Sequence, residues 1–278
     1  MKITCGCDPE LAIISGSRFV PCVDVVPGTK QEPFAVEGSK VGLKIQEDGV
    51  ALEFNIAPVE PKKFRNAMAT AMKELQPVVG KYFGVGHSYY VTDGATFEAA
   101  QLQHPKANTF GCDPDYLAYE RGARRLPPDP KKFGMSRFFG GHIHIGYEKK
   151  EPGEDGFIPE WALIKGLDLT YMFDVMDGAD PQPLRRQFYG LAGLYRSKPY
   201  GVEYRTPSAY WMNNLVRAER IILAAQTIVS RPNEFRRFHQ EVDWATIQQA
   251  VNTSRIAGNQ YDNISQQWHD FCELPEEV

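Results

Sequence analysis

Four segments of the chain alternate apolar and polar residues with the period of two that is typical of β-strands. They cover residues 2–14, 49–57, 140–147 and 200–206. Successive side chains of a strand point to opposite faces of a sheet, so the apolar residues of each segment share one face. Each segment therefore predicts a strand with one face on a hydrophobic core and one polar face. Two shorter strands are predicted at 18–25 and 85–91.

Other segments place apolar residues at helical spacing. The first predicts a helix that ends at Gly80, and its apolar positions are Phe64, Met68, Met72, Leu75 and Val79. Further helices are predicted over 160–176 and 209–230. The C-terminal segment of roughly 40 residues is also expected to be helical, because Trp244, Ile247 and Val251 form one apolar stripe.

The order of these elements predicts an α+β fold in which helices pack on an antiparallel sheet, because strands and helices do not alternate strictly. No linker-like segment divides the chain, so residues 1–278 are expected to form a single domain. Residues 93–136 are rich in glycine, proline and polar residues and predict a long irregular segment. Such a segment within a compact domain tends to be functional, and this one is expected to line a binding pocket.

The polar faces of the four longer strands share one kind of chemistry. They carry Asp8, Glu10, Glu53, His142, His144, Glu203 and Arg205. Antiparallel sheets often turn a polar face to water, which is the simplest interpretation. Two carboxylates about 7 Å apart, however, repel by about 2 kcal/mol at an effective dielectric near 20, so gathering several favours a cation. If the strands are neighbours, oxygen ligands with one or two imidazoles predict a site for Mg²⁺ or Mn²⁺.

The amino-acid composition mainly excludes certain classes of protein. The 31 lysines and arginines and 35 acidic residues leave a net charge of −4, which argues against a broad basic surface for nucleic acid. No apolar run has the length of a membrane span, and the start, MKITCGCDPE, lacks the apolar core of a signal peptide. We therefore expect a cytosolic protein whose five scattered cysteines are reduced thiols.

Common nucleotide and nucleophile motifs are absent. Gly80-Lys81 is followed by Tyr82, so there is no phosphate-binding loop of the GxxxxGK[ST] type, and no GxGxxG follows the first strand. A nucleotide would thus have to bind through metals and arginines. The GxSxG elbow of many serine hydrolases is missing as well.

Four motifs in order resemble the phage-associated COOH–NH₂ ligases of type 2, which belong to the glutamine synthetase and glutamate–cysteine ligase fold superfamily. The motifs are GCDPEL, DGVALEFNIAP, GGHIHIGY and YRSKPYGVEYRTPSAYW, between residues 6 and 211, and FGCDPDYLAY at 110–119 is also similar. The resemblance implies a curved antiparallel sheet with helices on its convex face and two or three Mg²⁺ ions on the concave face. It also implies an enzyme that uses ATP to phosphorylate a carboxylate, which an amine then attacks to form an amide.

The resemblance also implies roles for individual residues. Metal ligands would be Asp8, which stands where glutamine synthetases have Glu, together with Glu10, Glu53, His142 and Glu203. His144 would touch the nucleotide, and Arg205 and Arg196 would contact phosphate during catalysis. The ammonium-binding loop and the large N-terminal domain of glutamine synthetase have no visible counterpart.

Two other functions remain open at this point. The two histidines of GGHIHIGY could serve a metal-dependent hydrolase, and the chain could be a noncatalytic phage protein that retains the fold. For the ligase, the partners would be a small-molecule or peptide carboxylate and an amine, whose identities the sequence does not give. A phage-encoded protein would work in the host cytoplasm.

Overall fold

The computed structural model describes residues 2–108, 115–121, 123–126, 130–180, 184–256 and 259–272. Cys112 and residues 110–114 of the fifth motif lie outside these residues.

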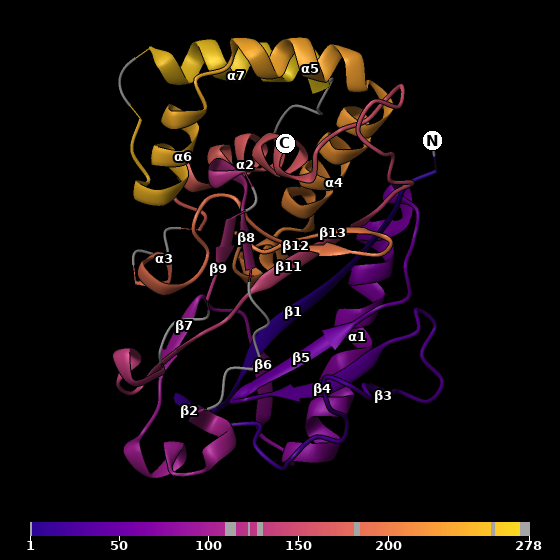
Figure 1. Ribbon diagram of the computed structural model, residues 1–278. Coiled ribbons are helices and arrows are strands. Elements are labelled where there is room, and N and C mark those ends of the chain that lie inside the picture. The colour runs from indigo at the N-terminus through magenta and orange to yellow at the C-terminus, as the bar shows by residue number, and fades with distance from the viewer. Residues whose placement is uncertain are drawn as a thin grey trace.

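A large antiparallel sheet forms the centre of the molecule (Figure 1). Its strands are β1 (Thr4–Ser15), β2 (Arg18–Val20), β3 (Phe34–Ala35), β4 (Lys44–Asp48), β5 (Ala51–Asn55), β6 (His87–Tyr90), β8 (Asp115–Leu117), β9 (Ala123–Arg125), β11 (Gly141–Gly146), β12 (Leu194–Lys198) and β13 (Gly201–Tyr204). The main path runs β3-β4-β5-β1-β11-β13-β12-β8-β9, and β2 and β6 also pair with β1. A small second sheet pairs β7 (Gly94–Thr96) with β10 (Ser136–Phe138).

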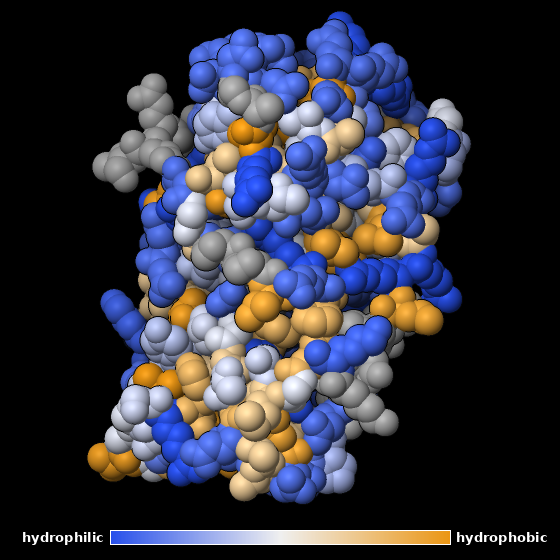
Figure 2. Space-filling view, turned by 90° about the vertical axis from the view of Figure 1, so that its left-hand side faces the viewer, coloured by the Kyte–Doolittle hydropathy of each residue, from blue (hydrophilic) through white to orange (hydrophobic). Residues whose placement is uncertain are grey.

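Most of the helices pack in two layers on one face of this sheet. These helices are α1 (Phe64–Phe83), α2 (Glu160–Met176), α4 (Leu215–Ser230), α5 (Pro232–Glu241), α6 (Trp244–Thr253) and α7 (Gln260–Cys272). The short helix α3 (Arg185–Phe188) instead packs Phe188 against Phe133 and Phe138. Helix α2 contacts β12 and β13, and α4 contacts β11, while α6 and α7 pack on α2. Figure 2 shows that the outer helices at the top of the molecule present a mainly hydrophilic surface. This arrangement confirms the predicted α+β class.

The main hydrophobic core lies between the helices and the predicted apolar strand faces. Cys5, Cys7 and Leu11 of β1 are almost fully buried there, against residues such as Phe64 and Trp211. A second, smaller cluster covers part of the opposite face and includes Ala95 of β7, Phe97 directly after it, and Phe139 directly after β10. Both faces of the sheet are therefore protected at this end of the molecule.

One face assignment was wrong. Val50 was expected to share a face with Leu52 and Phe54, but it packs in the smaller cluster. The reason is local: Gly49 has a φ of 57° and places Val50 in the turn before β5. The alternation of the strand begins only at Ala51.

Most predicted helices are confirmed, with changes at their ends. Helix α2 spans the predicted residues 160–176, whereas α1 continues through Gly80. It ends at Gly84, whose φ of 92° suits only glycine. The helix expected from residue 209 begins at Leu215, because Asn214 accepts a hydrogen bond from the backbone N–H of Val216 and caps it.

The sequence pattern missed β3, β4 and β12. It also missed the short strands β7, β8, β9 and β10, which lie within or at the end of the segment 93–136 that was predicted to be irregular. Within the described residues, no helix combines the length and the apolar character needed to cross a membrane.

Candidate functional site

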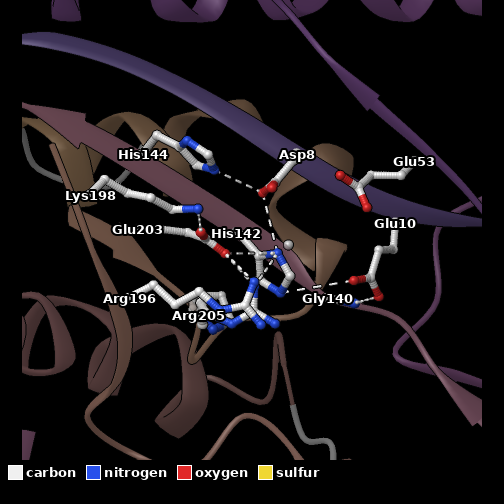
Figure 3. Close-up of polar contacts among 12 residues, drawn as sticks. Asp8, Glu10, Glu53, Gly140, His142, His144, Arg196, Lys198, Glu203 and Arg205 are labelled. Carbon is white, nitrogen blue, oxygen red and sulfur yellow. Dashed lines mark hydrogen bonds and ion pairs between the residues drawn. The ribbon is translucent and has the colours of Figure 1, made fainter. Parts of the chain in front are cut away.

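The strands that carry the predicted site residues are neighbours in the sheet. On β1, Asp8 lies opposite His142 and Glu10 lies opposite Glu53. On the other side of β11, His144 lies opposite Glu203, which in turn lies opposite Arg196 on β12. The pairings bring all the predicted polar side chains to the sheet face opposite the helices (Figure 3).

Three of these side chains form what we call the histidine cluster: Asp8, His144 and Glu203. One ligand atom from each lies within 4.8 Å of the other two. His144 Nε2 and Asp8 Oδ1 form a buried ion pair at 3.1 Å, in which neither atom has a well-directed hydrogen bond. Buried polar atoms of this kind are costly unless something else, such as a cation, coordinates them.

A second group, the acidic cluster, consists of Glu10, Asp48 and Glu53, again within 4.8 Å of one another. Asp48 comes from the end of β4 and was not predicted as a site residue. Gln46 donates a hydrogen bond to Glu53 at 2.8 Å, and the backbone N–H of Gly140 donates to Glu10 at 2.7 Å. These bonds fix two of the three carboxylates while leaving oxygen atoms for a ligand.

Neighbouring cations such as Lys30 only partly offset the mutual repulsion of the carboxylates in the acidic cluster. Burial raises the pKa of Glu53 well above its usual value, and the negative charges of Asp8, Asp48 and Glu10 raise it further. Burial and Glu10 likewise raise the pKa of Asp48. A bound divalent cation would reverse this electrostatic penalty.

The histidine cluster differs because basic side chains surround it. Burial raises the pKa of Asp8, but His144 and His142 together hold that pKa well below its usual range. Burial also acts to raise the pKa of Glu203, but the Arg205 guanidinium brings that pKa below its usual value. Lys198 Nζ also lies 2.7 Å from Glu203 Oε2. Any cation bound here would therefore compete with protein cations for Glu203.

The two predicted arginines are buried and share a carboxylate that sequence reasoning missed. Arg196 Nε and Arg205 Nε lie 3.1 and 3.0 Å from Asp115 Oδ1. Asp115 belongs to β8, so the 93–136 segment does reach the site. Arg205 also donates to Glu203 Oε1 and to His142 Nδ1, the latter at 3.1 Å. The guanidinium groups are thus held rigidly beside both clusters.

His142 lies between the clusters. Its Nδ1 is 3.2 Å from Asp8 Oδ1 and its Nε2 is 4.0 Å from Glu10 Oε1. Each of the other predicted site residues belongs to one of the two clusters or is one of the two arginines. The structure therefore brings all the predicted site residues together on one face of the sheet.

Two cavities adjoin the site. A cavity of about 50 Å³ lies beside the acidic cluster and is lined by Glu10, Asp48, His142, Arg137 and Arg205 among others. A larger one, about 450 Å³, lies beside the histidine cluster and includes Asp8, His144, Arg196, Lys198, Tyr200 and Glu203. The larger volume is in the range of small-molecule sites.

A protein-family match agrees with the resemblance seen in the motifs. The family described as "Phage phiEco32-like COOH.NH2 ligase-type 2" matches residues 134–273, which include β11, β12 and β13. No curated protein matches the chain. A solved structure described as "Crystal structure of novel glutamine synthase homolog" is similar at 10% identity and a TM-score of 0.43. The likeness covers 98% of this chain and 66% of that one, so this chain spans less than two thirds of that protein. The chain belongs to the phage phiEco32-like COOH–NH₂ ligases of type 2.

Proposed function

We propose that the protein joins a carboxylate to an amine at the expense of ATP, through an acyl phosphate and with Mg²⁺ or Mn²⁺. The observation that carries this proposal is the pairing of two ligand clusters on one sheet face, with buried arginines beside them. A single cluster would suit many metal enzymes. Two adjacent clusters with arginines suit transfer of a phosphoryl group, whose charge is spread over several oxygens.

The residues present fit divalent cations. Asp8 and Glu203 would hold one ion together with an imidazole of β11, for which the resemblance implies His142 and the geometry also offers His144. Glu10, Asp48 and Glu53 would hold another, so five of the six ligands are oxygen donors, as Mg²⁺ and Mn²⁺ prefer. The buried atoms of the histidine cluster that lack hydrogen bonds and the raised pKa values of the acidic cluster support this fit. When bound, the ions would neutralise phosphate charge in the transition state.

The arginines would bind the transferred phosphoryl group. Asp115 and Glu203 hold Arg205 from two sides, so its orientation needs little reorganisation during the reaction. Arg196 is oriented by the same Asp115. We assign the larger cavity to the nucleotide, because Arg196 and Lys198 line it, and the smaller cavity to the reacting carboxylate.

The chemistry balances in two steps. A carboxylate oxygen forms a bond to the γ-phosphorus of ATP while the bond to the bridging oxygen breaks, which releases ADP. The amine nitrogen then attacks the acyl carbon, loses a proton, and expels phosphate together with the original carboxylate oxygen. Use of ATP is in keeping with a cytoplasmic protein, in the host cell if a phage encodes it.

Release of ADP tests the proposal. Mixtures of small or peptide carboxylates with amines are incubated with the protein, ATP and Mg²⁺, and mass spectrometry identifies the condensed product. We expect ADP release that needs both substrates and is lost in Glu203→Gln. The matched control, Glu98→Gln, changes an exposed carboxylate paired with Arg18 and should keep full activity.

Other outcomes would support other functions. Hydrolysis that depends on metal but releases no ADP would favour the metal-dependent hydrolase. Failure to bind ATP or metal would favour a noncatalytic phage protein.

A further inference from the structure

The smaller cavity beside the acidic cluster adjoins a further cavity of about 460 Å³, which we call the outer cavity. The half-buried ring of Phe138 lines both of them. Arg185 lines the smaller cavity, and its neighbour Leu184 lines the outer one. The same is true of Arg137 and its neighbour Ser136. The outer cavity therefore continues the smaller one past Phe138.

Two buried guanidinium groups line the smaller cavity where it meets the outer one. Arg137 is 3% exposed and Arg185 is 2% exposed. Arg137 donates a hydrogen bond to the carbonyl of Ala107 at 3.0 Å, and Arg185 donates to the carbonyl of Thr206 at 2.9 Å. Carbonyl acceptors fix the position of a guanidinium without neutralising its charge. This part of the cavity therefore suits a carboxylate, which guanidinium groups bind well.

The outer cavity is different in character, because apolar side chains form much of its lining. Phe19, Ala95, Phe138 and Leu184 are among them, and Leu184 is 57% exposed. A ligand group that covers this surface gains the free energy of apolar burial. Asp93 also lines the outer cavity, and its negative charge disfavours a second acidic group there. The outer cavity therefore suits an uncharged apolar group.

We propose that the carboxylate substrate carries an uncharged apolar group close to its carboxylate, and that the outer cavity binds this group. A peptide that ends in a hydrophobic amino acid belongs to this class, as do branched and aromatic acids. The inference deepens the proposed function and rests on its assignment of the smaller cavity to the reacting carboxylate. A substrate with a short or acidic side chain would leave the apolar surface uncovered.

N-acetylated amino acids test the inference through binding alone, because they share one carboxylate and differ in the side chain beside it. Saturation-transfer NMR on the full chain, with Mg²⁺ and without ATP, gives dissociation constants for N-acetylleucine, N-acetylglycine and N-acetylglutamate. We expect N-acetylleucine to bind at least about 10-fold more tightly than the other two, since its side chain leaves water. Equal binding of all three, or tighter binding of N-acetylglutamate, would overturn the inference.

Leu184→Asp tests whether the outer cavity is the binding site. The position is exposed, so folding should be preserved, and N-acetylleucine should then bind no more tightly than N-acetylglycine. Val85→Asp is the matched control, because Val85 is a fully exposed apolar residue between α1 and β6 that lines neither cavity. It should keep the preference for N-acetylleucine. A preference that survives Leu184→Asp would refute the outer cavity as the site.

The binding readout is independent of the ligase reaction. Selective binding of N-acetylleucine without ADP release from any pair of substrates would contradict the proposed function alone. ADP release that is as fast with N-acetylglycine as with N-acetylleucine, together with equal binding of the two, would contradict only the apolar substrate.

Discussion

Arg205 makes more of the site's polar contacts than a simple counter-ion needs. It donates to Glu203 and to His142, and its Nε faces Asp115. A planar guanidinium with five donors can hold such a set and still present an edge to a phosphate, which a lysine ammonium cannot do.

We expect Arg205→Lys to lower kcat by roughly 100-fold or more, with a much smaller change in ATP affinity. The reason is that a contact made mainly in the transition state depends on the fork geometry and not only on charge. Steady-state kinetics of ADP release measure both effects. Arg18→Lys, in an exposed ion pair with Glu98, is the control and should behave like the unchanged protein. Near-normal turnover of a folded Arg205→Lys would make Arg205 a neutralising residue.

Single residues of the site were predictable where they lie on long alternating strands. Asp8, Glu10, His142 and Glu203 follow from the period of two, since that period fixes the face of each side chain. Asp48 and Asp115 were missed because β4 and β8 are short, and their place depends on which strand they pair with. The hydroxyl of Tyr200 reaches His144 across a turn, and no local pattern reports such a contact.

At the scale of elements, β11 lies unusually close to the segment that follows β13. A side chain at Gly141 would clash with the backbone carbonyl of Ser208, while the Gly141 N–H donates to Pro207 O at 3.0 Å. The glycine therefore lets the strand with the two histidines approach the strand with Glu203 and Arg205 at this end.

Gly141→Ala should lower the free energy of unfolding by about 1–3 kcal/mol, because the backbone must move to accommodate the methyl group. Gly80→Ala is the matched control, since its side chain would meet no atom within 4 Å and would sit within α1. It should leave stability equal or raise it by up to about 1 kcal/mol. Urea unfolding compares the two, and an equal effect of both substitutions would contradict the close approach.

Helix α2 is joined to β13 by a buried acid. Tyr204 donates a hydrogen bond to Asp168 at 2.6 Å, and Asp168 is fully buried. Burial raises the pKa of Asp168 to about 7, although the hydrogen bond from Tyr204 partly opposes this. The folded protein thus favours the protonated carboxyl, whereas the unfolded chain ionises near pH 4.

Asp168 therefore makes the free energy of unfolding depend on pH. The stability that Asp168 contributes is present below the ordinary pKa and is lost as pH rises through about 7. The side chain in Asp168→Asn stays neutral at every pH. The free energy of unfolding of this variant minus that of the unchanged protein should therefore increase by about 2–3 kcal/mol between pH 5 and pH 8. Urea unfolding at both pH values measures this difference. Asp177→Asn, at an exposed position beside α2, should show no such change, and a constant difference for Asp168→Asn would contradict the buried-acid account.

The ends of helices and strands were predictable where the local sequence determines them. They were not predictable where tertiary packing determines them. Helix α2 matches its apolar pattern because nearly every turn of it is buried. Gly80 did not end α1, since a glycine with helical φ is tolerated when its neighbours Val78 and Val79 pack in the core. The strand β12 was missed because Arg196 and Lys198 make it look like a polar loop.

At the scale of the whole molecule, the site depends on long-range strand pairing. The order β5-β1-β11-β13-β12 places β1 between β5 and β11, two strands that come after it in the chain. The apolar faces predicted that helices cover one side of the sheet. They could not predict this order, because each strand would bury the same face beside any neighbour. Only the combined tertiary contacts bring Asp8 beside His142 and His144 beside Glu203.

For the molecule as a whole, we propose that the site activates a carboxylate by phosphorylating it. The most direct measurement uses a carboxylate substrate labelled with oxygen-18, with the phosphate released during amide formation analysed by mass spectrometry. The account predicts that one labelled oxygen passes from each carboxylate into the released phosphate. Phosphate free of label, with all of the oxygen-18 retained in the amide and in water, would contradict it.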